Sequence, residues 1–272
     1  MNKIVSLQRL LIAAFFGFTW LCAGQELIQQ ETKRESDVTK NFIVHTPNEQ
    51  EAFNELLGAL KESFWYKNNG YKVPFPSHPA FKALEEHPEK IETLDWEKYF
   101  KTFVTEVYKP LNCAPIQKLL TDQESILLSA LEKMQHLQQQ WGFKIFPLYT
   151  IILGLYGPGG QYYSNCGNIV INVTAEGYPI SQRPFCEIMI HEMVHIGIED
   201  IIVQKFQLTH WEKEALVDVI CSLYFNNLLP HYWIQPRGDK RIKEHVTYEN
   251  IHSDLPSSIK QYASRYPREE IA

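Results

Sequence analysis

The segment His191-Glu192-Met193-Val194-His195 constrains the fold of this chain more than any other feature. Its two histidines are four positions apart, so they share one face of the segment only if the segment is helical. On a helix, two imidazoles at this spacing can bind a single metal ion. The glutamate between them projects about 100° round the helix from His191, because an α-helix has 3.6 residues per turn. The segment therefore predicts a metal-binding helix with Glu192 beside the ion rather than on it.

A second acidic motif, Glu214-Ala215-Leu216-Val217-Asp218, follows His195 after eighteen intervening residues. Its two carboxylates are also four positions apart, and the residues around them are apolar. A carboxylate among apolar side chains has to be paired or coordinated. We therefore expect Glu214 to complete the metal site from a second helix, and Asp218 to hold the outer nitrogen of a ligand histidine.

Two imidazoles and one carboxylate suit zinc, and a catalytic zinc site leaves its fourth position for water. The sequence thus predicts Zn²⁺ as the cofactor, with His191, His195 and Glu214 as its ligands. Glu192 would take the proton from a water that the zinc activates. The alternative is a chance match on an ordinary helix, which predicts that the protein binds no zinc at all.

The spacing of the two motifs resembles that of the gluzincins, the metallopeptidase clan that includes thermolysin and the membrane-alanyl aminopeptidases. The resemblance covers about 28 of the 272 residues. It implies that His191, His195 and Glu214 bind zinc, that Glu192 is the general base, and that Asp218 supports a ligand histidine.

The resemblance also bears on substrate binding and on the type of peptidase. It implies that the strand expected at 168–173 is the sheet edge that pairs with the substrate backbone. The GxMEN motif of the aminopeptidase branch is absent, so nothing indicates recognition of a free N-terminus. Ile198 and Ile201 stand where the metzincins have a glycine and a third histidine. An endopeptidase is therefore the expected type.

Peptide hydrolysis also needs a hydrogen-bond donor for the oxyanion that forms at the scissile carbonyl. Four residues near the second motif are candidates, namely His210, His231, Tyr232 and Arg237. The clan resemblance suggests a tyrosine or histidine from this downstream region, and Tyr232 is the best single choice. The alternative for each of the four is a surface or packing role.

Apolar periodicity predicts a mostly helical chain with a small sheet. The expected helices cover 49–66, 78–87, 96–108, 116–141, 183–205 and 211–227; the expected strands cover 146–156 and 168–173, with a turn at 157–160. With 44% hydrophobic residues, the chain can bury a full core. We predict an α+β fold in which a zincin-like metallopeptidase domain, 47–272, has a small mixed sheet and a two-helix metal centre. Its helical part would cover 47–142 and its catalytic part 143–272.

The first 24 residues have the pattern of a secretory signal peptide. Lys3 and Arg9 precede an apolar run at 10–18, and small residues precede the expected cleavage near Gly24. The run is shorter than the roughly 20 residues that cross a bilayer. We therefore expect a secreted or periplasmic protein with no membrane span in the mature chain, or alternatively a lipoprotein anchored at Cys22. Residues 25–46 are polar and are expected to form a flexible lead-in.

Charge and cysteine content restrict the partners and the covalent chemistry. Loss of Lys3 and Arg9 with the signal peptide changes the net charge from −6 to −8. Nucleic acid is excluded as a partner, because phosphate binding needs a clustered basic surface. The mature chain would keep four cysteines, which allow three disulfide pairings or remain buried thiols. They are Cys113, Cys166, Cys186 and Cys221.

The expected function is that of an exported zinc metallopeptidase that cleaves a peptide or protein substrate with zinc-activated water and Glu192 as the general base. The alternative is a catalytically silent zincin fold that binds a partner in the cell envelope and uses zinc for stability only. Metal removal separates the two, because loss of a structural zinc costs folding. Cleavage specificity and oligomeric state stay open.

Overall fold

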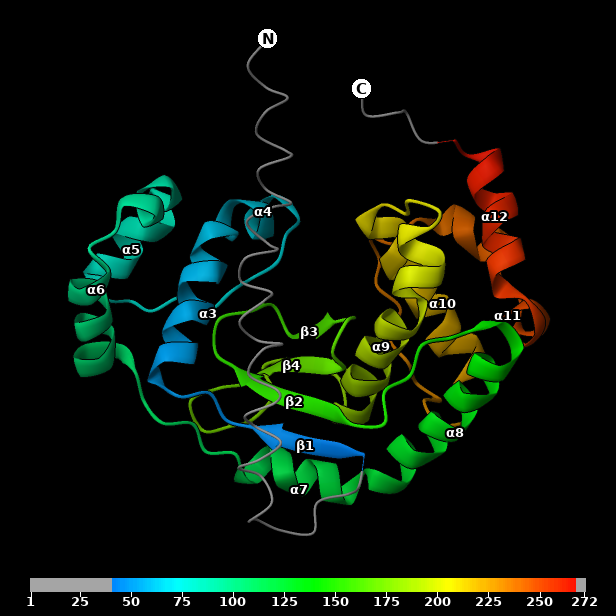
Figure 1. The fold of residues 1–272 in the computed structure, drawn as a ribbon, viewed down its shortest axis with the longest axis horizontal. Helices are drawn as coiled ribbons and strands as arrows, with labels where there is room; N and C mark the ends of the chain where they lie inside the picture. The colour runs from blue at the N-terminus through cyan, green and yellow to red at the C-terminus, as the bar shows by residue number, and fades with distance from the viewer. Residues whose placement is uncertain (1–40, 268–272) are drawn as a thin grey trace. The chain divides into compact units, whose positions relative to one another are not determined.

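Residues 41–267, the part of the chain that this computed structural model describes, contain a four-stranded sheet (Figure 1). Its strands are β1 (Phe42–His45), β2 (Tyr149–Gly154), β3 (Gly160–Tyr163) and β4 (Asn168–Asn172). They lie in the order β1, β2, β4 and β3. β2 pairs in parallel with β1 and β4, whereas β3 pairs antiparallel with β4, so the sheet is mixed.

The two middle strands confirm the strands predicted at 146–156 and 168–173. Every residue of β2 and β4 is buried, as expected for parallel strands covered on both faces. The prediction that 168–173 forms the sheet edge is wrong, because β3 pairs with β4 on that side, with Gln161 opposite Val170. β3 starts at Gly160, the last residue of the predicted turn, and takes the edge position.

β1 corrects part of the predicted lead-in. Residues 42–45 fall within the polar segment 25–46, yet they form a strand that pairs with β2, from Phe42 opposite Tyr149 to His45 opposite Ile152. Four residues are too few to show an apolar period. The strand is held instead by its neighbour, since the buried ring of Phe42 stacks on Tyr149 at 5.9 Å between centroids. The predicted signal peptide, Cys22 and residues 25–40 lie outside the described residues.

The helices of the first half gather beside one end of the sheet (Figure 1). They are α3 (Glu49–Lys61), α4 (Ser63–Asn68), α5 (Pro79–Glu86) and α6 (Trp96–Thr102), with the 3-10 helix η2 (Pro88–Thr93) and the π-helix η3 (Phe103–Val107). Their apolar faces form one core cluster, in which Phe53, Phe81 and Phe103 are fully buried. The single helix predicted over 49–66 is instead two helices that meet at Glu62.

α7 (Ala114–Asp122) and α8 (Glu124–Trp141) divide the long helix that was predicted over 116–141. The break falls at Gln123, whose side-chain oxygen accepts a hydrogen bond from the backbone N–H of Cys186 at 2.8 Å. This bond ties the break to the start of the next helix. α8 ends at Gly142 as predicted, where a φ of 83° lies in the left-handed region that favours glycine.

α9 (Phe185–Ile198) carries the His191 to His195 segment and is buried along its whole length. It packs against β3, β4 and α8, and α10 (His210–Tyr224) packs beside it. α9 continues into the π-helix η4 (Glu199–Gln204), so the two together account for the predicted helix 183–205. α10 starts at a capping box between Thr209 and Glu212. Both helices of the predicted two-helix centre therefore form.

Three elements after α10 were not predicted, namely η5 (Lys240–Glu244), α11 (Tyr248–Ser253) and α12 (Leu255–Arg265). Each begins at a side-chain N-cap, and each buries one isoleucine in the core. The short lengths of η5 and α11 give too few turns for an apolar period to be visible in the sequence.

At the level of fold class, the prediction is confirmed for residues 41–267, which form a mostly helical α+β structure with a small mixed sheet. Cys113, Cys186 and Cys221 are free thiols, so none of the three pairings within the predicted set forms. Among the described helices, none is both long and apolar enough to cross a membrane.

Candidate metal centre

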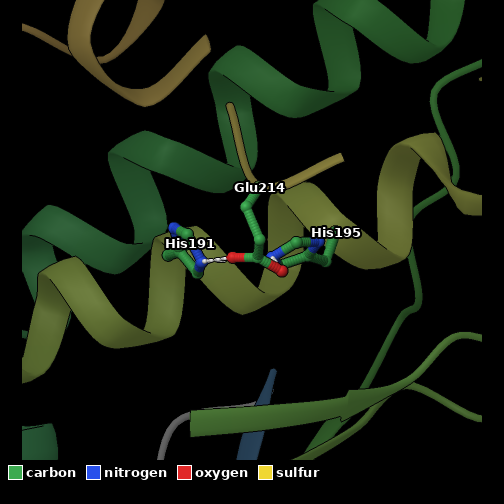
Figure 2. Close-up of side chains that lie close together, drawn as sticks. All are labelled: His191, His195 and Glu214. Carbon is green, nitrogen blue, oxygen red and sulfur yellow. Dashed lines mark hydrogen bonds and ion pairs between the residues drawn. The ribbon is translucent and has the colours of Figure 1, made fainter. Parts of the chain in front are cut away.

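α9 and α10 bring the three predicted ligands together (Figure 2). His191 and His195 are one turn apart on α9, and their Nε2 atoms lie 3.1 Å from each other. Glu214 reaches them from α10, with one carboxylate oxygen 3.4 Å from His195 Nε2 and the other 3.6 Å from His191 Nε2. All three side chains are buried. This group of donor atoms could hold one metal ion.

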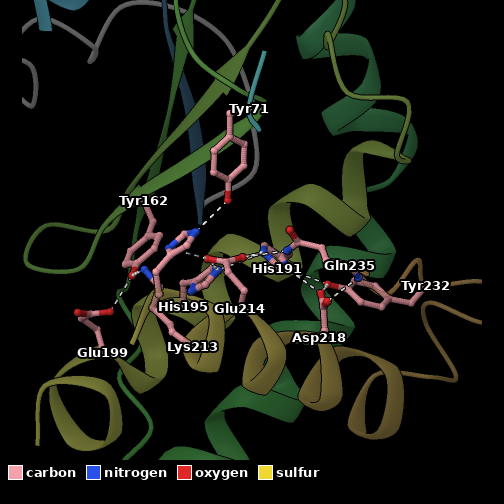
Figure 3. Close-up of polar contacts among 11 residues, drawn as sticks. Tyr71, Tyr162, His191, His195, Glu199, Lys213, Glu214, Asp218, Tyr232 and Gln235 are labelled. Carbon is pink, nitrogen blue, oxygen red and sulfur yellow. Dashed lines mark hydrogen bonds and ion pairs between the residues drawn. The ribbon is translucent and has the colours of Figure 1, made fainter. Parts of the chain in front are cut away.

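The outer nitrogen of His191 is held by a chain of hydrogen bonds that ends at Asp218 (Figure 3). His191 Nδ1 donates to the Tyr232 hydroxyl at 2.6 Å, and this hydroxyl donates to Asp218 Oδ1 at 2.8 Å. Asp218 itself lies 3.8 Å from His191 Nδ1 and is fully buried. With the proton fixed on Nδ1, the lone pair of Nε2 points toward the other ligands.

The position of Tyr232 corrects its predicted role. Its hydroxyl lies behind His191, on the nitrogen that faces away from Glu214, and both of its hydrogen bonds go to groups on that side. The contacts of Tyr232 therefore orient His191, one of the three donors, and the geometry gives no support to an oxyanion role. Asp218 acts on the histidine as the sequence predicted, with the tyrosine hydroxyl between them.

Gln235 contributes two further bonds to the centre that sequence reasoning missed. Its backbone N–H donates to Asp218 Oδ2 at 2.7 Å, and its side-chain amide donates to Glu214 Oε2 at 2.9 Å. One residue thus orients both Glu214 and Asp218. A glutamine in an irregular segment after a helix gives no periodicity or motif from which this role could have been predicted.

The His195 side of the centre is packed rather than hydrogen-bonded. The ring of Tyr162 on β3 stacks on the His195 ring at 4.7 Å and 6°. The Tyr162 hydroxyl donates to Glu199 at 2.7 Å and accepts from Lys213 at 2.9 Å, which fixes the ring. Within residues 41–267, His195 Nδ1 is buried without a hydrogen-bond partner, so the ring is oriented by this stacking and by the contacts of its Nε2 with His191 and Glu214.

Glu192 follows His191 on α9, only 6% of it is exposed, and its charge interacts with those of His191 and Glu214. No hydrogen bond from another described residue holds its carboxylate. One oxygen lies against Gly160 on the edge strand, so close that a Cβ at position 160 would stand 2.3 Å from it. Burial and the charge of Glu214 raise the pKa of Glu192 to about 7, against the lowering effects of His191, Lys213 and Arg183. This carboxylate is placed to accept a proton near neutral pH.

Tyr71 approaches the candidate centre from another side (Figure 3), and His210 lies between its hydroxyl and Glu214. The Tyr71 hydroxyl lies 3.0 Å from His210 Nε2, and His210 Nδ1 lies 3.8 Å from Glu214 Oε1. Tyr71 is held between the rings of Trp65 and Trp211, which stack on it at 5.6 and 6.3 Å. Burial and the charge of Glu214 raise the pKa of Tyr71, so its hydroxyl keeps its proton.

Of the four predicted oxyanion candidates, His210 is the one that faces Glu214, with its Nδ1 3.8 Å from Glu214 Oε1. Arg237 instead donates to the backbone oxygen of Asn69 and packs over Trp211, and so supports the segment that carries Tyr71. His231 is exposed on the surface. Sequence reasoning missed Tyr71, because it lies 143 positions before Glu214 and belongs to no motif.

The protonation states of the three donor side chains depend on one another. Burial alone would lower the pKa of His191, but hydrogen bonds with Cys221 and Glu214 and the nearby carboxylates raise it to about 10. Burial lowers the pKa of His195 to about 3. Burial would raise the pKa of Glu214, yet the two histidines hold it well below its usual range. The group therefore retains one proton on His191 beside an ionised Glu214, and a bound cation would replace that proton.

Comparisons with known proteins identify no relative. No protein-family model matches the chain, and no curated protein and no solved structure matches it.

Proposed function

We propose that this protein is a zinc-dependent metallopeptidase with a zincin-like fold. The observation that carries the proposal is the placement of a buried carboxylate, Glu192, directly beside three convergent donor atoms. A purely structural metal site has no need of such a group. The gluzincin-like spacing of the two motifs supports peptide hydrolysis as the reaction.

The donor atoms fit zinc in both chemistry and spacing. Bonds of about 2.0 to 2.1 Å around a tetrahedral zinc ion place neighbouring ligand atoms about 3.3 Å apart. The two imidazole nitrogens lie 3.1 Å apart, and each lies 3.4 or 3.6 Å from a different oxygen of Glu214, so each of these pairs is close to this value. When bound there, zinc would supply Lewis-acid polarisation of a carbonyl and increase the acidity of water.

Side chains of the protein would carry out proton transfer and stabilise the developing oxyanion. Glu192 would take the proton from the attacking water and later pass it to the leaving amine. The hydrogen-bonded pair of Tyr71 and His210, in which His210 Nδ1 lies 3.8 Å from Glu214 Oε1, would donate a hydrogen bond to the carbonyl oxygen as negative charge develops there. The edge strand β3 lies next to Glu192 through Gly160, where an extended substrate chain would reach the base. We also propose that the protein cleaves bonds within peptides rather than at their ends, and that the mature chain is exported.

The proposal is tested with Glu192→Gln, which keeps the size of the side chain and removes its basicity. We expect the purified variant to bind zinc as the wild type does, while kcat on a mixture of peptides falls about 10²- to 10⁴-fold. Elemental analysis and mass spectrometry of cleaved peptides provide the two measurements. Equal turnover by the two proteins would refute the role of Glu192, and absence of zinc from the wild type would refute the metal centre.

A further inference from the structure

Arg183 places a cation beside the metal centre that the proposed chemistry does not use. It stands two residues before α9, and its guanidinium carbon lies 4.7 Å from the ring centre of Trp233 and 5.6 Å from that of Tyr232. The Tyr232 ring in turn stacks on His191 at 6.3 Å. One aromatic ring therefore separates the guanidinium from a metal ligand.

Among the described residues, no carboxylate lies within ion-pair distance of the Arg183 guanidinium. Arg241 shows the contrast, because it makes three hydrogen bonds to Asp239 between 2.5 and 3.2 Å. Arg183 instead lies over the rings of Trp233 and Tyr232 and is half-buried. A guanidinium stacked in this way keeps its planar N–H edge available for a bidentate contact.

Three carboxylates sense the charge of Arg183 from further away. Glu187, one turn into α9, lies beneath it, and Glu192 and Asp218 lie on the metal side; the charge of Arg183 lowers the pKa of each. A purely structural role as their counter-ion is therefore the competing explanation. A counter-ion role predicts that loss of Arg183 affects every substrate equally. A substrate-binding role predicts that it affects some substrates more than others, and kinetics can tell the two apart.

We propose that Arg183 binds a carboxylate of the substrate and so selects peptides that carry one close to the scissile bond. The proposal rests on the proposed peptidase function. A bidentate carboxylate is the partner that matches the free edge of a stacked guanidinium. An extended chain rises about 3.3 Å per residue, so the carboxylate would belong to a residue within about three positions of the scissile bond. Trp233 and Ile234, 54% and 39% exposed, offer apolar surface for a neighbouring side chain.

Two sources share this chemistry, the C-terminal carboxylate and the side chain of an aspartate or glutamate. Three peptide libraries of equal length separate them: one with a free C-terminus, one amidated, and one amidated with aspartate near the C-terminus. The zinc-loaded protein is compared with Arg183→Gln. Arg265→Gln serves as the matched control, since Arg265 also packs on a ring, that of Tyr266 at 5.8 Å.

We expect kcat/KM for the preferred carboxylate library to fall about 10- to 100-fold in Arg183→Gln, with less than about a threefold change for the plain amidated library. The aspartate library tells which source is used. Arg183→Lys should recover part of the loss, because it restores the charge without the planar fork. An equal loss on all libraries, or no preference in the wild type, would overturn the proposal in favour of the counter-ion role.

Binding measurements separate this inference from the proposed activity. In the Glu192→Gln background, calorimetry with the same peptides gives affinities that require no turnover. If the acid binds at least tenfold more tightly than the amide and Arg183→Gln abolishes the difference, the carboxylate subsite stands even if the wild type cleaves nothing. If binding does not distinguish acid from amide, the subsite is refuted whatever the turnover.

Discussion

Two tyrosines, Tyr71 and Tyr232, approach the candidate metal centre from different sides, and their contacts indicate different roles. The Tyr71 hydroxyl lies 3.0 Å from Nε2 of His210, whose Nδ1 faces Glu214 at 3.8 Å, whereas the Tyr232 hydroxyl lies 2.6 Å from the outer nitrogen of His191. In the proposed reaction, the pair of Tyr71 and His210 would act on the carbonyl. Tyr232 would act only through His191. The same substitution, tyrosine to phenylalanine, should therefore have different effects at the two positions.

We expect Tyr71→Phe to lower kcat about 10²- to 10³-fold, the range for loss of one oxyanion donor, with zinc affinity unchanged. Tyr232→Phe should weaken zinc binding about 10- to 100-fold and largely recover its kcat when zinc is saturating. Competition with a chromophoric chelator measures the affinities, and peptide hydrolysis at several zinc concentrations measures kcat. The reverse pattern, with zinc loss at position 71 and a kcat defect at 232, would contradict both assignments.

For individual residues, the sequence predicts the positions of those within its two motifs and of few others. His191, His195, Glu214 and Asp218 are found where helical spacing places them, because a regular helix converts sequence distance into direction. Tyr71 and Gln235 come from irregular segments whose positions depend on packing of the whole domain. No local pattern specifies such positions, and Tyr232 was assigned the wrong side for the same reason.

The edge strand β3 and the helix α9 meet at Gly160, where the absence of a side chain makes room for Glu192. A Cβ at this position would stand 2.3 Å from the Glu192 carboxylate and 2.9 Å from Ile188. We expect Gly160→Ala to push the carboxylate aside and lower kcat about 10- to 100-fold, since a displacement of about 1 Å can cost this much. Zinc content should not change, because none of the three donors contacts Gly160.

Gly58→Ala on α3 is the control for this experiment, because nothing lies within 4 Å of a Cβ at that position. It should leave kcat unchanged and stabilise the helix by about 0.5 to 1 kcal/mol. A Gly160→Ala variant with full activity would show that Glu192 does not act from its position beside β3.

Glu55 on α3 joins the helical first half to the end of β2. Its carboxylate accepts hydrogen bonds from the backbone N–H groups of Leu155 and Tyr156, both at 2.9 Å. Burial nevertheless raises the pKa of Glu55 from 4.5 to about 7, although these bonds oppose the shift. Because the folded-state pKa is above the unfolded one, the stabilisation is complete below about pH 4.5 and is lost as the pH rises to about 7.

Each pKa unit corresponds to about 1.4 kcal/mol, so this loss amounts to roughly 2 to 3 kcal/mol for a half-buried residue. Glu55→Gln keeps an oxygen that accepts the two backbone bonds and has no charge to bury. The free energy of unfolding of the wild type relative to this variant should therefore decrease by that amount between pH 4.5 and 7.5. Urea titrations at each pH measure it, and a constant difference would show that Glu55 does not bear the predicted shift.

The elements themselves were predicted where an apolar period continues for several turns, as in α8 and α9. The strand β1 and the short helices η5 and α11 were not, because short segments take their stability from neighbours rather than from their own pattern. The edge role of β4 failed for a different reason. It was carried over from a resemblance, and in this chain the glycine-rich stretch before β4 supplies an additional strand at that edge.

On the scale of the whole molecule, the core cluster around Phe53 is separate from the candidate metal centre. The core cluster around Phe53 contains none of the three donors, and β2 and β4 are buried through their own apolar residues. The protein should therefore fold without zinc. The donor side chains nevertheless bury charge that a cation would neutralise, so zinc should bind the folded chain far more tightly than the unfolded one.

We expect metal-free protein to keep its far-UV circular dichroism and to melt cooperatively, with a Tm that rises when zinc is added. A thousandfold excess of zinc over its Kd adds about 4 kcal/mol of stability, which corresponds to about 8 to 16 °C for a domain of this size. Glu214→Gln, which removes one donor and keeps the side-chain volume, should abolish most of this rise. An unfolded metal-free protein would favour the alternative of a structural zinc in a silent zincin fold. A full thermal shift in Glu214→Gln would place the zinc elsewhere, because loss of a carboxylate ligand weakens a site that depends on three donors.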